Sequence, residues 1–105
     1  MSEAILVLCS CASTEEAEKI ARKLLEEKLA ACVQVNPGIK SYYHWKEKLE
    51  HSEEVQISIK TTCEKWDALE TRIKSLHSYE IPEILSIRVD QVSAPYLEWF
   101  FQSIN

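Results

Sequence analysis

Glycine is almost missing from this chain, which has one glycine and three prolines among 105 residues. Flexible linkers and disordered segments are rich in these two residues, so the composition leaves little room for either. The length is typical of one domain, and 46% apolar residues are enough to build one hydrophobic core. We therefore expect a single folded domain over residues 1–105.

Clustered basic residues are missing as well. The chain carries 12 Lys and Arg against 17 Asp and Glu, for a net charge of -5. Proteins hold a nucleic-acid backbone with grouped Lys and Arg side chains, so we expect no nucleic-acid partner. Charges of both signs alternate along the predicted helices, which is typical of solvated helix faces.

No apolar run approaches the roughly 20 residues that a membrane-spanning helix needs. The apolar start before Cys9 superficially resembles a lipoprotein processing site. However, no Lys or Arg precedes this run, and it is about half the length of a signal core. We therefore expect a cytoplasmic protein without membrane contact, in which Cys9, Cys11, Cys32 and Cys63 are thiols.

Known catalytic motifs are also absent from the sequence. It contains no nucleophile elbow, no phosphate-binding loop and no zinc-hydrolase helix pattern. The three histidines could be combined with a serine or cysteine on paper, as in any chain. We expect that the protein is not an enzyme.

What the sequence does contain is a regular alternation of strand and helix patterns. Apolar residues recur at helical spacing or alternate with polar ones, and Ser13–Glu16 and Thr61–Glu64 each predict a capping box. Asn36-Pro37-Gly38 predicts a turn or bend. The predicted order is strand, helix, strand, strand hairpin, helix, strand and short helix, over residues 4–9, 13–25, 29–35, 39–59, 66–76, 84–89 and 93–104.

This order predicts an α+β fold of the ferredoxin-like βαββαβ type, with an extended hairpin and a short C-terminal helix. Both main helices would cover one face of a four-stranded antiparallel sheet. We expect Gln56, Ser58, Lys60 and Arg88 on the other face, a set too polar for a second core. That face would be either solvated or covered by another subunit.

Four sequence blocks carry a resemblance to a known family. They are "LAACVQVNPGIKSYYHW" (29–45), "EEVQISIKTT" (53–62), "HSYEIPEI" (77–84) and "YLEWF" (96–100). Their order and spacing resemble the CutA family of divalent-cation tolerance proteins over nearly the whole length. The resemblance implies the ferredoxin-like fold, a tight homotrimer whose long hairpins reach neighbouring subunits, and similarity to the trimer of PII signalling proteins.

The resemblance also implies a site for copper or another divalent cation. In the family, a cysteine closing the first strand and a histidine of an "HHPY" motif are associated with copper, and Cys9 and His77 match them. Thiolate and imidazole suit copper, but two ligands bind weakly, so Glu80, Glu83 or a neighbouring subunit would complete the set. The alternative is that Cys9 is a core residue and that His77 is favoured by the helix dipole.

The chain departs from the family pattern in ways that bear on this site. Leu76 stands at the first histidine of the motif, Ser78 at its proline, and Glu47 at a glycine of the hairpin turn. One candidate ligand is therefore missing. Cys9 and Cys11 point to the same side of a continuing strand. Their C-x-C spacing is only a weak copper signal, because copper chaperones use C-x-x-C.

Lys60, Tyr79 and Glu83 are the candidates for a second site. A cleft between subunits could bring Lys60 against Glu83 and bind a small molecule, or the two residues could form a structural ion pair. Two functions are thus predicted. The first is weak binding of copper or similar divalent ions by a homotrimer that supports metal tolerance. The alternative is a PII-like signalling or adaptor trimer whose clefts bind a small anion or a protein partner.

Overall fold

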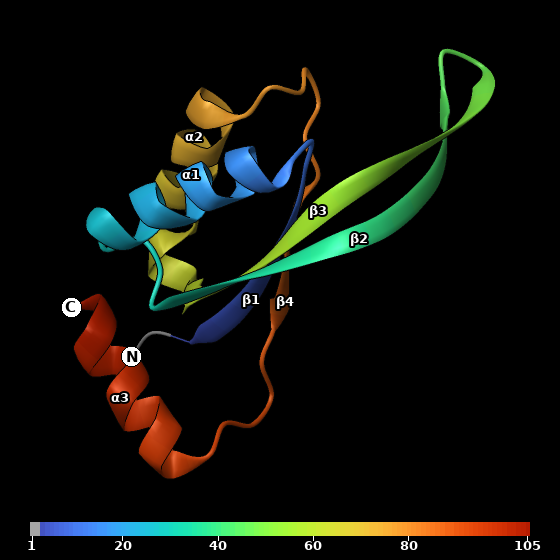
Figure 1. Cartoon of the computed structure of the whole chain (residues 1–105). Coiled ribbons are helices and arrows are strands. Elements are labelled where there is room, and N and C mark those ends of the chain that lie inside the picture. The colour runs from blue at the N-terminus through green and yellow to red at the C-terminus, as the bar shows by residue number, and fades with distance from the viewer. Residues whose placement is uncertain (1–2) are drawn as a thin grey trace.

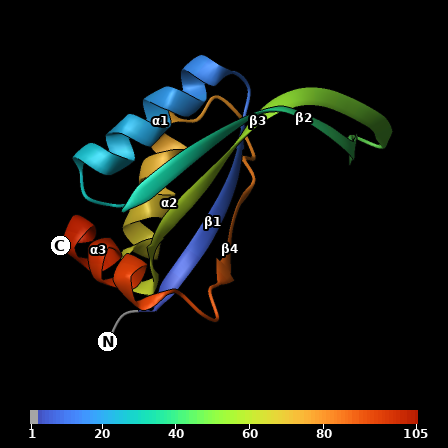
Figure 2. The ribbon, with the colours of Figure 1, turned by 60° about the horizontal axis from the view of Figure 1, so that its bottom comes forward.

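The computed structural model describes residues 3–105 and contains the predicted alternation of strands and helices (Figure 1). The sheet order is β2-β3-β1-β4, and every neighbouring pair is antiparallel. Helices α1 and α2 cover one face of this sheet (Figure 2). The predicted α+β, ferredoxin-like fold is confirmed. Its elements are β1 (Ala4–Cys11), α1 (Thr14–Glu26), β2 (Cys32–Trp45), β3 (Lys48–Thr62), α2 (Trp66–Leu76), β4 (Ile84–Arg88) and α3 (Ala94–Ile104).

The main core lies between the sheet and helices α1 and α2. Alternate residues of each strand face the helices, and Val7, Ile57 and Ile59 are completely buried there. Helix α1 adds Ile20 and Leu24, which share one face because they are four residues apart. Burial of these aliphatic side chains is the main force that holds the layers together.

The capping box at the start of α1 is confirmed. The Glu16 amide donates to Ser13 Oγ at 3.1 Å, and the Glu16 carboxylate accepts from the Ala12 amide at 3.0 Å. The second predicted box is wrong. Thr61 lies inside β3, and its buried hydroxyl donates to the Leu29 carbonyl at 2.7 Å. A short 3-10 turn (Cys63–Lys65) then leads into α2.

Of the turn or bend predicted at Asn36-Pro37-Gly38, the structure shows a bend, because β2 runs through these residues. The pairing with β3 shifts between Asn36 and Ile39, and Gly38 adopts a φ of 79°. This irregularity bends the strand without ending it. The hairpin turn includes Glu47, as predicted, and is a two-residue turn in which both Lys46 (φ 51°) and Glu47 (φ 67°) are left-handed. A glycine would adopt that conformation at lower cost than Glu47, by roughly 1 kcal/mol.

The face opposite the helices differs from the prediction at one residue. Arg88 pairs with buried Ile5, and Ile87 pairs with Leu6, so Arg88 belongs to the helix side. The Arg88 guanidinium lies 2.7 Å from the Glu3 carboxylate. The face opposite α1 and α2 therefore has an apolar half on β1 and β4 beside the polar half on β2 and β3. Leu85 and Ile87 in this apolar half are 43% and 48% exposed.

Helix α3 packs against one end of the sheet, away from α1 and α2 (Figure 1). Phe100 and Ile104 are buried there in a second, smaller apolar cluster with Ala31. Pro95 lies in the first turn of α3, where its missing amide proton costs nothing. Of the helices in residues 3–105, none is both long enough and apolar enough to span a membrane.

Candidate metal centre

The end of β1 and the end of α2 bring two thiols and an imidazole together in the core. Potential ligand atoms of Cys9, Cys11 and His77 all lie within 4.8 Å of one another. All three side chains are completely buried. The structure thus places Cys9 beside His77, as the metal hypothesis requires. It adds Cys11, which strand alternation had placed on the same side of the strand as Cys9.

Both ring nitrogens of His77 already have hydrogen-bond partners. Nε2 lies 2.7 Å from the Ser10 carbonyl oxygen, which can only accept, so Nε2 carries the proton. Nδ1 accepts from the Tyr79 amide at 3.0 Å. These partners select the neutral Nε2–H tautomer. A metal ion could bind His77 only after the hydrogen bond from the Tyr79 amide is broken.

The sulfur of Cys9 is held as a thiol. A hydrogen bond with Cys11 raises the pKa of Cys9 far above its ordinary value, and burial and the nearby charges of Glu83 and Glu16 act in the same direction. Metal binding requires the thiolate, so an ion at this site must displace a proton.

Glu16 ties the loop after α2 to the start of α1. One of its carboxylate oxygens accepts from the Ala12 amide, and the other accepts from the Ser78 amide at 2.9 Å. Burial acts to raise the pKa of Glu16, but the hydrogen bonds from Ser78 and Ala12 together outweigh it and lower that pKa. The nearest carboxylate oxygen lies 3.9 Å from His77 Nδ1, so Glu16 also borders the cluster.

We expect the Glu16→Gln variant to lose less stability in acid than the wild type does. Because the pKa of Glu16 is lowered by folding, its contribution is complete above the unfolded value of about 4.3 and disappears as pH falls through the folded value. Urea unfolding at neutral pH and at several acidic pH values measures this difference. Glu18→Gln, on the exposed side of α1, is the matched control. Equal acid sensitivity of the wild type and Glu16→Gln would contradict the assignment.

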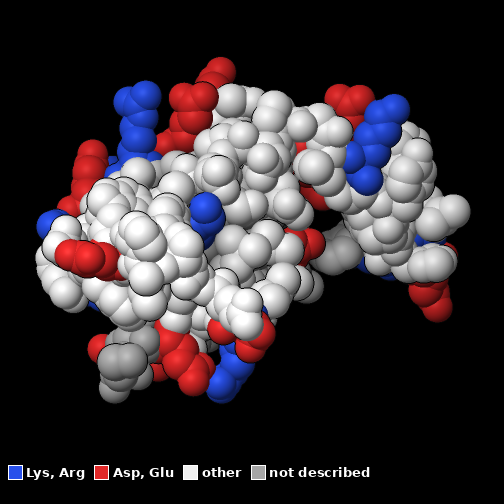
Figure 3. Space-filling view, turned by 90° about the horizontal axis from the view of Figure 1, so that it is seen from below, with Lys and Arg blue, Asp and Glu red and all other residues white. Residues whose placement is uncertain are grey.

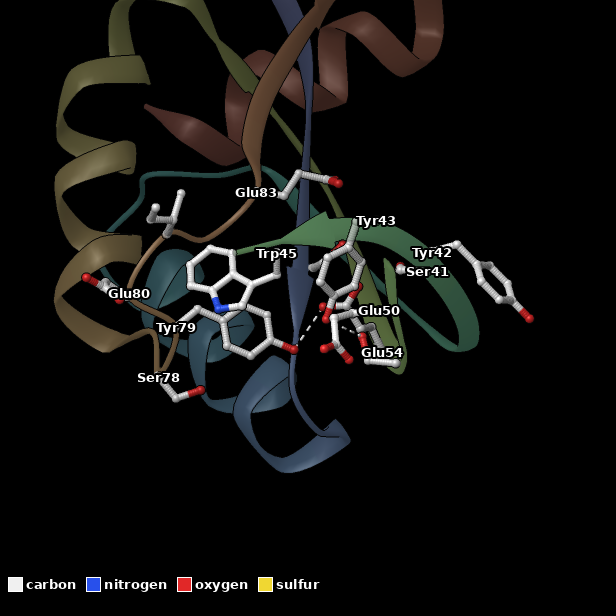
Figure 4. A pocket seen from close by; sticks show the side chains of 13 residues that line it. Ser41, Tyr42, Tyr43, Trp45, Glu50, Glu54, Ser78, Tyr79, Glu80 and Glu83 are labelled. Carbon is white, nitrogen blue, oxygen red and sulfur yellow. Dashed lines mark hydrogen bonds between the residues drawn. The ribbon is translucent and has the colours of Figure 1, made fainter. Parts of the chain in front are cut away.

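A pocket of about 950 Å³ lies between the β2–β3 hairpin and the loop that follows α2. In Figure 4, Tyr79 reaches from that loop towards β3, where its hydroxyl donates to Glu54 at 2.8 Å. Burial raises the pKa of Tyr79, and the bond to Glu54 raises it further. Carboxylates and aromatic rings dominate the lining, namely Glu50, Glu54, Glu80, Glu83, Tyr42, Tyr43, Trp45 and Tyr79.

Of the three residues proposed for a ligand site, the chain brings only two together. Tyr79 and Glu83 line the pocket, whereas the Lys60 ammonium lies 3.4 Å from the Tyr96 hydroxyl and 5.3 Å from the centre of its ring. Contact between Lys60 and Glu83 of a neighbouring subunit stays a prediction. The described residues that line the pocket include four carboxylates and no cationic side chain, so a small anion would be repelled.

Glu80 and Glu83, named as possible further metal ligands, line this pocket and do not belong to the group of close ligand atoms. Charges on the face shown in Figure 3 are scattered, with Lys and Arg beside Asp and Glu. This face therefore offers no continuous positive surface.

A sequence model described as "CutA1 divalent ion tolerance protein" matches residues 5–103. The chain belongs to this family. It is 47% identical over 90 residues to a Protein CutA homolog of Xenopus laevis, a match that covers 86% of this chain but 60% of that protein. It is 42% identical over 103 residues to the Divalent-cation tolerance protein CutA of Citrobacter koseri, covering 98% of this chain and 90% of the relative.

Solved CutA structures have the same fold. The structure of CutA from Xylella fastidiosa superposes with a TM-score of 0.95 at 38% identity, covering 99% of this chain and 100% of that chain. CutA1 from Oryza sativa gives a TM-score of 0.95 at 34% identity, with coverage of 98% and 94%. The family resemblance seen in the sequence blocks is therefore confirmed, and the CutA family is described by tolerance of divalent ions.

Proposed function

We propose that this CutA protein supports tolerance to copper, or to a similar divalent metal ion, by binding the ion weakly at Cys9 and His77. The observation that carries the proposal is the convergence of a thiol and an imidazole within 4.8 Å in the core. Sulfur and imidazole donors suit copper and zinc, whereas Mg²⁺ and Ca²⁺ prefer oxygen. The donors present thus fit a thiophilic transition metal.

Weak binding follows from what the ion must displace. The buried Cys9 thiol must lose its proton, and His77 must give up at least the hydrogen bond that it accepts from the Tyr79 amide. Each of these losses is subtracted from the metal–ligand free energy. The complete burial of the three side chains also requires the loop after α2 to open before an ion can enter.

We further propose that the protein works as a cytoplasmic homotrimer. Large apolar side chains outside the core support assembly, since Tyr42, Leu49 and Ile81 are 70%, 71% and 71% exposed in the single chain. Exposed apolar surface of this kind commonly marks subunit contacts. Cys9, Cys11, Cys32 and Cys63 are all free thiols, which suits a reducing compartment.

The test is a titration of the reduced protein with copper against a competing chelator. We expect one ion per chain, with affinity at least about 100-fold lower in Cys9→Ser and in His77→Ala, because even outer-shell changes cost 10–100-fold. Cys63→Ser is the matched control, because Cys63 is exposed. Light scattering on the same samples should give a trimer for every variant.

Unchanged copper affinity in both Cys9→Ser and His77→Ala would remove the assignment of these ligands. A monomeric mass at micromolar concentration would contradict the proposed assembly independently of the metal result.

A further inference from the structure

Cys11 is a buried thiol to which the family resemblance assigns no role. It ends β1, where it pairs with Val55 of β3, and it lies on the same face of the strand as Cys9. Its sulfur is within 4.8 Å of the Cys9 sulfur and of a His77 ring nitrogen. Two thiols and one imidazole therefore converge on a single point between β1 and the end of α2.

We propose that Cys11 is the third ligand of this site, and that the completed set of two sulfurs and one nitrogen prefers monovalent copper to divalent ions. This inference rests on the proposed function, because it concerns the same site. With Cys11 as a ligand, the expected ion is Cu(I) instead of a divalent cation.

The kind of donor supports this preference. Thiolates are soft ligands and select Cu(I) and other thiophilic ions, while hard divalent cations require carboxylate, carbonyl or water oxygens. Here the group of close ligand atoms consists of Cys9, Cys11 and His77, without a carboxylate. Glu16 is the adjacent acid, and its two oxygens already accept from the Ala12 and Ser78 amides.

The number of donors supports it as well. Zn²⁺ in a structural protein site takes four ligands in a tetrahedron, and an open zinc site completes its set with water. The three side chains are completely buried, and within residues 3–105 no further Cys, His, Asp or Glu joins them. Cu(I) has a lower charge and is softer than Zn²⁺, so two thiolates and one imidazole can satisfy it without a fourth donor.

The two sulfurs are held in place by the centre of the sheet. Cys9 pairs with Ile57 on one side and with Ile84 on the other, and Cys11 pairs with Val55. Strand alternation then fixes both side chains on the helix face. A sulfur pair positioned by rigid strands loses little conformational freedom on binding an ion, which favours this pair over flexible surface thiols.

The experiment compares Cu(I) and Zn²⁺ binding by the whole chain, under anaerobic conditions with a reductant. Each ion is titrated against a competing chelator of known affinity, in the wild type, Cys11→Ser, Cys11→Ala, Cys9→Ser and the control Cys63→Ser. We expect Cu(I) affinity to fall at least about 100-fold in both Cys11 variants and to stay unchanged in Cys63→Ser. X-ray absorption of the Cu(I) form should show two sulfurs and one nitrogen in the wild type, and one sulfur fewer without Cys11.

Two Cys11 variants are used because a buried serine hydroxyl could disturb the core, whereas alanine cannot introduce an unpaired polar group. Circular dichroism confirms that each variant is folded. Wild-type Cu(I) affinity in both Cys11 variants, with the loss confined to Cys9→Ser, would overturn the third ligand and leave the proposed function intact. Zn²⁺ binding as tight as that of Cu(I) would overturn the preference. Cu(I) binding unaffected by any of these changes would overturn the proposed function itself.

Discussion

Replacing Ile57 with alanine is expected to lower the free energy of unfolding by about 2–5 kcal/mol. Ile57 is completely buried in the main core and lies in β3, between Val35 of β2 and Cys9 of β1. Alanine would remove three carbons and leave a cavity that the surrounding strands cannot close, because β3 is paired on both sides. The cost therefore includes lost burial and lost contacts.

Urea unfolding followed by circular dichroism measures this change. Ile57→Val is the matched control, with an expected cost of about 0.5–1.5 kcal/mol for a single methylene. The measurement should be repeated at several protein concentrations, since subunit assembly adds a concentration-dependent term to the apparent stability. A cost below about 1 kcal/mol for alanine would show that Ile57 is not enclosed as described.

The second large effect is expected in α3. Phe100 is the largest buried residue of the small cluster that holds this helix on the sheet, together with Ile104 and Ala31. Phe100→Ala should cost about 3–5 kcal/mol of docking free energy, because losing the buried ring leaves a cavity between α3 and the sheet. We expect α3 to open locally, with amide hydrogen exchange in this helix about 100-fold faster or more.

Hydrogen exchange followed by mass spectrometry can separate α3 from the rest of the chain. The paired strands β1 and β3 should keep their protection in Phe100→Ala. Gln102→Ala, at an exposed position of the same helix, is the control and should exchange like the wild type. Equal acceleration across the sheet and α3 would mean that the helix is part of the global unfolding unit.

Much of the fold could be predicted from local patterns. The order of the elements follows from apolar spacing, and the first capping box follows from the letters around Ser13. The alternating pattern of β4 did not predict which face of the sheet its apolar residues occupy. Alternation shows that Leu85 and Ile87 share a face, but it does not show which face, because that depends on their pairing with Leu8 and Leu6. Arg88 was misplaced for this reason.

Less of the candidate site could be predicted from the sequence. Cys9 and His77 are 68 positions apart, and no periodicity relates the end of a strand to the end of a later helix. The prediction that these two residues lie together came from the family resemblance. Cys11 could be placed beside Cys9 by alternation alone. The distance between Lys60 and the pocket depends on which end of β3 lies near the loop after α2, and that is set by the three-dimensional arrangement of the sheet.

An ion bound to His77 would also disturb the loop after α2. A neutral imidazole has one nitrogen lone pair, and in this protein that lone pair receives the Tyr79 amide. An ion on Nδ1 would take the lone pair directly, and an ion on Nε2 would force the proton onto Nδ1, which then could no longer accept. In either case the Tyr79 amide would lose its acceptor, while the Tyr79 side chain donates to Glu54 across the pocket. An ion and the loop would therefore compete for one lone pair of His77. By thermodynamic reciprocity, a stronger contact between Tyr79 and Glu54 would lower the affinity of the proposed site for the ion.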